Sequence, residues 1–233
     1  MTAPLFTQIF LILLTGTLLT RLWLARRHVR HVLGHRRQVP APFRGKILLK
    51  AHHKAADYTV SKTRFAMLAG LIDVLLLLGW TLGGGLEFLD QNWRAAGFGE
   101  LVTGTLFLLS AFLIMALLDL PATLYQTFVI EQRFGFNRST PALFVADLLK
   151  QTLLLFVIGA PLALAALWLM QSAGTLWWFY LWLLWSGFTL LMMWAYPAVI
   201  APLFNKFTPL KNRNVQTRIQ ALLRRTGFRS RGI

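Results

Sequence analysis

Five long apolar segments dominate the pattern of hydrophobic and polar positions along the chain. They cover residues 5–24, 65–82, 101–125, 148–170 and 176–203. About 20 helical residues cross a hydrocarbon core of about 30 Å, so each segment is long enough to span a membrane. The pattern therefore predicts an all-α fold: a polytopic transmembrane helix bundle with about five spans.

Two polar segments carry apolar residues at helical spacing, which predicts amphipathic helices beside the membrane. In residues 47–58 the apolar positions recur every three or four residues among lysines, a pattern typical of a basic helix lying on the membrane surface. Residues 215–223 repeat the pattern among arginines, and Gly227 predicts the end of that helix. Its apolar stripe can lie on lipid or pack on a partner domain, and periodicity does not separate the two. We expect both helices on the cytoplasmic side.

The distribution of charge predicts how the spans are oriented. Residues 26–64 hold 11 Lys/Arg and one acid, and residues 206–231 hold 8 Lys/Arg and none, whereas the loop at 83–100 has one Arg among three acids. Because basic loops stay in the cytoplasm, the N-terminus is expected outside and the C-terminus inside. Residues 1–210 then form the five-span domain, and residues 211–233 begin a cytoplasmic basic segment.

Composition narrows the class of protein. Hydrophobic residues make up 56% of the chain, which places it outside the soluble class. The net charge of +16 is read as topology signal and contact with the lipid bilayer; no nucleic acid partner is expected, since aromatic residues are not interleaved with the charges. No cysteine is present, which excludes thiolate zinc sites. Together with the short termini, this suggests a multi-pass protein of a bacterial inner membrane.

Two acids inside the apolar spans are the first candidates for function. Asp73 lies eight residues into the second segment and Asp119 six residues before the end of the third, so both sit roughly 10 Å below the cytoplasmic face. Carboxylates are rare in hydrocarbon unless they have a partner or a polar cavity. The equal depth favours a polar cavity open to the cytoplasm; local contacts with nearby basic residues are the alternative.

The segment after the third span adds polar candidates. Gly135 permits a turn with positive φ, and Thr140 can cap a helix that begins at Pro141. Glu131 and Asn137 remain as polar side chains beside apolar ones, and Asp147 and Lys150 follow.

The end of the fifth span breaks the rules for a membrane helix. Residues 196–210 contain Pro197, Pro202 and Pro209, with Asn205 and Lys206 between them. Prolines remove backbone donors, so irregular backbone is predicted here, and inside a membrane such backbone lines a site or cavity.

Histidines at helical spacing raise the question of a metal. His28, His31 and His35 share a helical face, but Val32 directly follows His31, at the position where a zinc peptidase would have a glutamate as general base. Flanking arginines would also repel a dication. We therefore predict no metal-binding and no catalytic residues in this chain.

Several segments together resemble the type I CAAX prenyl proteases, which are integral-membrane zinc metallopeptidases. The resemblance runs in order over about residues 40–229 and is carried by Lys54–Tyr58, residues 62–65, 120–131, 134–137, Asp147 with Lys150, and 196–210. It implies that several membrane helices enclose a chamber and that a zinc domain cleaves substrates near the cytoplasmic face. It also implies that Glu131, Asn137, Asn205 and Lys206 lie at the cytoplasmic mouth, beneath that domain.

The chain departs from this family where the chemistry resides. The family's His-Glu-x-x-His motif and later glutamate have no counterpart in the 233 residues. The resemblance thus implies zinc for the full-length family but no cofactor in this chain, with a catalytic zinc domain as a possible missing C-terminal part. We expect a truncated membrane domain of a zinc metalloendopeptidase acting on prenylated or membrane-associated proteins, inactive alone. The alternative is a non-enzymatic scaffold or small transporter that uses Asp73 and Asp119.

Overall fold

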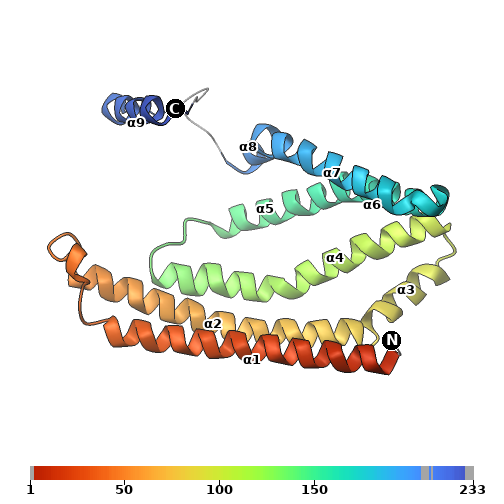
Figure 1. Cartoon of the computed structure of the whole chain (residues 1–233), viewed down its shortest axis with the longest axis horizontal. Helices are drawn as coiled ribbons and strands as arrows, with labels where there is room; N and C mark the ends of the chain where they lie inside the picture. The colour runs from red at the N-terminus through yellow and green to blue at the C-terminus, as the bar shows by residue number, and fades with distance from the viewer. Residues whose placement is uncertain (1–2, 206–209, 211, 229–233) are drawn as a thin grey trace. The chain divides into compact units, whose positions relative to one another are not determined.

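The computed structural model describes residues 3–205, 210 and 212–228, and these residues form helices and turns with no strand (Figure 1). In chain order the helices are α1 (Ala3–His35), α2 (Leu49–Thr81), α3 (Gly85–Ala95), α4 (Glu100–Tyr125), α5 (Pro141–Leu154), α6 (Ala160–Ser172), α7 (Trp177–Ala195), α8 (Ala201–Phe204) and α9 (Arg213–Thr226). Short 3-10 turns lie at Ala41–Phe43 and Gly174–Leu176, and wide π-helical turns lie at Gln126–Glu131, Leu155–Gly159 and Tyr196–Ile200.

Five helical stretches in the described part of the chain are long and apolar enough to cross a membrane. They are Pro4–His35, Leu49–Thr81, Glu100–Glu131, Pro141–Ser172 and Gly174–Phe204. The prediction of an all-helical chain with five spans is confirmed. Each stretch is 31–33 residues long, which at 1.5 Å per residue is about 48 Å and exceeds a hydrocarbon core of about 30 Å. The helices therefore extend beyond the apolar segments from which the spans were predicted.

The basic segment at residues 47–58 differs from the expectation of a separate surface helix. It forms the first half of α2, which runs unbroken from Leu49 into the second span. The physical reason is that residues 49–69 contain neither glycine nor proline, so nothing ends the helix before the apolar stretch begins.

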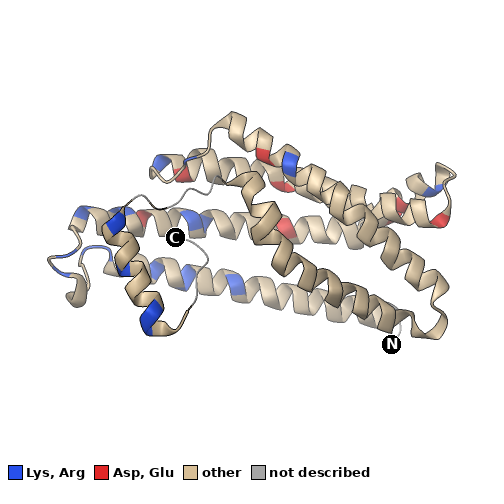
Figure 2. Cartoon of the chain, turned by 90° about the horizontal axis from the view of Figure 1, so that it is seen from above, with Lys and Arg blue, Asp and Glu red and all other residues tan. Residues whose placement is uncertain are grey.

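The chain divides into two compact units, Met1–Leu167 and Trp168–Ile233. In the first unit, α1 and α2 lie side by side and α3 leads into α4 (Figure 1). Lys and Arg gather where α1, α2 and the turn between them meet, far from the N-terminus (Figure 2). We call this the basic end of the unit.

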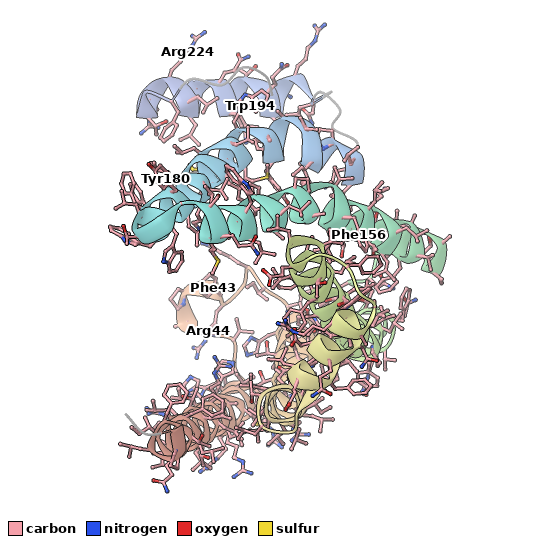
Figure 3. All side chains as sticks on the ribbon, turned by 90° about the vertical axis from the view of Figure 1, so that its right-hand side faces the viewer. Phe43, Arg44, Phe156, Tyr180, Trp194 and Arg224 are labelled. Atoms are coloured by element: carbon pink, nitrogen blue, oxygen red, sulfur yellow. The ribbon has the colours of Figure 1, made fainter. Side chains whose placement is uncertain are left out.

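Apolar side chains mostly face outward, as expected where lipid replaces a protein core. Tyr180, which is 44% exposed, projects from the start of α7 (Figure 3). The few buried apolar side chains of the first unit gather largely at its basic end: Val29, Ala56, Val60, Ile130 and Phe134. This small core joins α1, α2 and the end of the third span, close in sequence to the candidates Glu131 and Asn137.

Two of the three wide turns are explained by prolines. A proline at position i cannot donate to the carbonyl of residue i−4, and its ring clashes with that carbonyl. For Pro161 that carbonyl belongs to Val157, inside the turn Leu155–Gly159, and for Pro202 it belongs to Ala198, inside Tyr196–Ile200. Of the predicted irregular segment 196–210, residues Tyr196–Ile200 form a widened turn and the helix continues through Phe204, whereas residues 206–209 lie outside the described residues.

The second unit contains the amphipathic helix predicted from the tail. Asn212 caps α9, because its side chain accepts hydrogen bonds from the backbone of Asn214 and Val215. Gly227, with φ 72°, ends the helix as predicted, and the Phe228 N–H donates to the Leu223 carbonyl at 3.1 Å. This is the hydrogen bond of a Schellman motif.

Candidate functional site

Asp73 and Asp119 line one cavity in the first unit. The cavity has a volume of about 530 Å³ and lies between α2, α3 and α4. Its walls are mostly apolar, with Thr81 as the other hydroxyl-bearing or charged residue among them. The Thr123 hydroxyl donates to Asp119 Oδ2 at 3.1 Å. The two acids chosen from their depth thus face the same space, one from each neighbouring span.

Asp73 also borders a second hollow, on the side of α2 that faces α1. This hollow has a volume of about 620 Å³ and includes Arg21 and Gln126 among its lining residues. Asp73 therefore lines both hollows along α2, whereas Asp119 lines only the first of the two.

The segment from Glu131 to Asn137 closes the helix that follows α4. Phe136 N–H donates to the Glu131 carbonyl at 2.9 Å and Gly135 N–H to the Gln132 carbonyl at 3.0 Å. Gly135 has φ 71°, as its predicted turn requires, and the pattern is again a Schellman motif. Asn137 continues the closure: its amide donates to Gln132 Oε1 at 2.9 Å and its oxygen accepts from Ser139 N–H at 2.7 Å.

Of the other predicted residues in the first unit, Thr140, Asp147 and Lys150 are not among those that line the cavity. Thr140 caps α5 by accepting from Leu143 N–H at 3.2 Å, as predicted. Within α5, Lys150 donates to Asp147 at 3.2 Å, a half-buried pair on adjacent turns. Asn205 is exposed at the end of α8, and Lys206 lies outside the described residues.

A contact at the basic end was not predicted as a site. The guanidinium of Arg36, the residue directly after α1, donates from Nε and Nη2 to both oxygens of Asp57 on α2, each at 2.7 Å. These hydrogen bonds raise the pKa of Arg36 above its ordinary value. Such a bidentate pair fixes both distance and angle between two elements. The available signal was that Asp57 is the only acid among residues 26–64.

An aromatic cluster extends this junction to the Gly135 turn. The Tyr58 ring packs edge-on against Phe134 at 5.4 Å and Phe136 at 4.8 Å between centroids. Lys54 Nζ lies 5.2 Å from the centre of the Phe136 ring, and Lys62 Nζ lies 5.8 Å from the centre of the Tyr58 ring. Edge-to-face rings and cations over ring faces both attract. The cluster holds the turn against the first half of α2.

The histidines do not fit a zinc site. The described residues contain no group of three or more His, Cys, Asp or Glu placed to hold a metal ion. His31 and His35 have ring centroids 4.2 Å apart, and His35 Nδ1 lies 2.9 Å from the His31 carbonyl oxygen. His52 Nε2 lies 3.0 Å from the His35 carbonyl oxygen. Three protein ligands are needed for a catalytic zinc ion, and this donor set does not supply them.

The fold and these sites define a polytopic membrane protein whose polar groups gather along α2 and at one basic end. The family model described as the CAAX prenyl protease N-terminal region, with five membrane helices, matches residues 28–206. The chain therefore belongs to the CAAX prenyl protease family, in the part that forms the five membrane helices.

Individual relatives agree with the family assignment. The chain is 32% identical over 198 residues to a CAAX prenyl protease 1 homolog from Oryza sativa subsp. japonica, covering 82% of this chain and 46% of the relative. It is 32% identical over 213 residues to the homolog from Mus musculus, covering 88% of this chain and 45% of that relative. The crystal structure of S. mikatae Ste24p matches with a TM-score of 0.82 and 25% identity, covering 94% of this chain and 52% of that one. The chain thus spans about half the length of these relatives.

Proposed function

We propose that this chain forms the membrane half of a CAAX-type zinc metalloendopeptidase. The observation that carries the proposal is the family match over residues 28–206, which covers all but the first part of the five-span region. In this role the chain supplies membrane anchoring and substrate contacts. The substrates would be prenylated or membrane-associated proteins, as the names of the relatives suggest.

In this proposal, residues of a separate zinc domain carry out the hydrolysis. Zinc catalysis needs three protein ligands and a base that activates the bound water, and the 233 residues contain no His-Glu-x-x-His sequence. We propose that a catalytic zinc domain docks near Glu131, Asn137, Asn205 and Lys206. Asp73 and Asp119 would then face the substrate path through their shared cavity of about 530 Å³.

The test is reconstitution. We expect the purified chain to retain no stoichiometric zinc after dialysis and to cleave no prenylated CAAX peptide. Adding a polypeptide that carries the zinc domain of a relative should restore cleavage. Retention of one zinc ion per chain, lost on His31→Ala, would contradict the first part. Failure of every zinc-domain partner to restore cleavage, with both polypeptides folded and bound to each other, would contradict the second.

A non-enzymatic transporter is the second candidate, and the shared cavity of Asp73 and Asp119 favours it. Carboxylates facing one space within a membrane mark many ion pathways. Reconstituted liposomes should then show ion flux that Asp73→Asn and Asp119→Asn each abolish. Absence of flux in the wild-type chain would remove this candidate and leave the peptidase role.

The location of the chain extends the same proposal. We propose an N-outside, C-inside arrangement, supported by the basic residues between the first two spans. The earlier prediction of a bacterial inner membrane receives no support from the relatives named above, which come from a plant, a mouse and a yeast. It stays a prediction, and membrane fractionation of the source cells would test it.

A further inference from the structure

A third hollow, separate from the acidic cavity, lies between α2 and the end of the third span. It has a volume of about 550 Å³ and is lined by Ser61, Arg64, Phe65, Leu68, Tyr125, Val129, Ile130, Arg133 and Phe134. We propose that this hollow, the Arg64–Arg133 site, binds the headgroup of an anionic phospholipid. The proposal does not depend on the peptidase role.

The polar lining of the hollow suits an anion. Arg64 comes from α2 and Arg133 from the helical turn that follows Gln126–Glu131, so two separate elements bring guanidinium groups to one space. The hydroxyl groups of Ser61 and Tyr125 are further donors, and none of the lining residues is a carboxylate. Guanidinium groups bind phosphate through paired N–H donors, which gives geometric preference as well as charge.

One acid that interacts with Arg133, Asp57, is already engaged. Asp57 interacts electrostatically with Arg133, but both of its oxygens accept from Arg36 at 2.7 Å. The Arg133 guanidinium also lies 5.7 Å from the centre of the Phe134 ring. These contacts orient Arg133 without placing a carboxylate in the hollow, so its positive potential remains available to a ligand.

The depth of the hollow matches a phospholipid. Arg64 immediately precedes the apolar stretch that begins at Phe65, so its charge lies where headgroups lie. The Phe65 and Tyr125 rings have centroids 5.0 Å apart, and tyrosine is enriched at this level of a membrane. Leu68, about one turn deeper along α2, and Val129, one turn from Tyr125 towards Arg133, are exposed apolar side chains that an acyl chain can cover. The lipid phosphate would then contact the guanidinium groups, and its acyl chain would contact these apolar residues.

The experiment uses the full 233-residue chain in nonionic detergent, with native mass spectrometry to count bound phosphatidylglycerol and phosphatidylcholine. We expect tighter binding of phosphatidylglycerol. Arg64→Gln with Arg133→Gln should weaken it about 25-fold, since each basic residue near an anionic lipid contributes about 1 kcal/mol, or about fivefold. The control, Arg44→Gln with Lys50→Gln, removes the same charge at the α1–α2 turn, where Arg44 is labelled in Figure 3, and outside the hollow. It should leave binding within about twofold of wild type.

Three results would overturn the site. Equal loss in the two double variants would mean general attraction to a basic surface. Equal binding of both lipids would mean no headgroup preference. Displacement by inorganic phosphate alone would mean a free-anion site rather than a lipid site. Where the Gln pair does not fold, Arg64→Lys with Arg133→Lys replaces it. That variant keeps the charge and loses the planar fork, so about fivefold weaker binding is expected, and binding equal to wild type would also overturn the site.

Discussion

At the scale of single residues, the basic end depends on a few contacts that join elements distant in sequence. Arg36 and Asp57 link α1 to α2 through two hydrogen bonds of 2.7 Å. Tyr58 carries the link on to the Gly135 turn through the rings of Phe134 and Phe136. Because lipid-facing helices lack a common apolar core, such specific contacts decide where the turn lies relative to α2.

Gly135 provides the sharpest test at this scale. Gly135→Ala should lower the free energy of unfolding by about 1–2 kcal/mol, because an alanine at φ 71° brings its Cβ close to the next carbonyl oxygen. The added Cβ itself would meet only Lys54 Nζ, at 3.7 Å, so the cost is conformational. Gly135→Asn should lose less, since asparagine enters this region more readily. Unfolding in SDS, followed by circular dichroism, measures the difference.

The matched control is Gly34→Ala, inside α1. Apart from the neighbouring residues and nearby backbone of α1, no atom lies within 4 Å of the Cβ that it adds, and its backbone is helical. Alanine is the better helix former by about 1 kcal/mol, so this variant should be as stable as wild type or more stable. Equal destabilisation by the two alanine variants would show that the Gly135 turn carries no special strain.

At the scale of elements, the number of spans could be predicted from the sequence but their ends could not. A long apolar segment predicts each span, whereas the ends of its helix depend on where a glycine or proline occurs. Residues 49–69 contain none, so the predicted surface helix and the second span form one helix, α2. The helix α3 was expected as a loop, although Leu86, Leu89 and Trp93 stand at helical spacing. Its eleven residues are too few to stand out between two spans.

Part of the candidate site could likewise be predicted from the sequence, and part could not. Asp73 and Asp119 could be paired from their equal depth, and the structure places them on one cavity. The Gly135 turn and the Thr140 cap follow from local sequence rules. The Arg64–Arg133 hollow could not be found that way, because periodicity does not tell which faces of α2 and the third span meet. Only tertiary packing determines that.

The docking of α3 gives a prediction at this scale. Trp93 Nε1 donates to Ser110 Oγ on α4 at 2.8 Å. Trp93→Phe keeps an aromatic ring but loses this hydrogen bond, worth about 1 kcal/mol, so amide exchange across α3 should become about fivefold faster. Hydrogen–deuterium exchange with mass spectrometry resolves this. Trp194→Phe, at a side chain 66% exposed, is the control and should leave α3 unchanged. Unchanged exchange in Trp93→Phe would mean that α3 is held by other contacts.

At the scale of the whole molecule, charge is distributed along the chain rather than balanced within elements. Residues 26–64 hold 11 Lys/Arg against Asp57 alone, whereas Glu87, Asp90 and Glu100 surround the single Arg94 of the loop that follows α2. Within α3, Arg94 pairs with Asp90 at 2.6 Å, which raises the pKa of Arg94. With three acids against one Arg, that loop has no net positive charge. The two ends of α2 thus differ strongly in the quantity that sets orientation.

This asymmetry predicts the sidedness of the chain. A reporter fused after Ile233 should be active only in the cytoplasmic compartment, and one inserted at Gly99 only on the opposite side. With five spans, the N-terminus must then lie on the side of Gly99, because an odd number of crossings separates the two ends.

Replacing Arg26, Arg27 and Arg30 with glutamine should reduce this orientation bias, since basic residues near a span dominate orientation. A paired assay with one phosphatase and one fluorescent protein at each position measures both sides. The reverse labelling at both positions would overturn the N-outside arrangement, and identical labelling at both would require an even number of crossings between them.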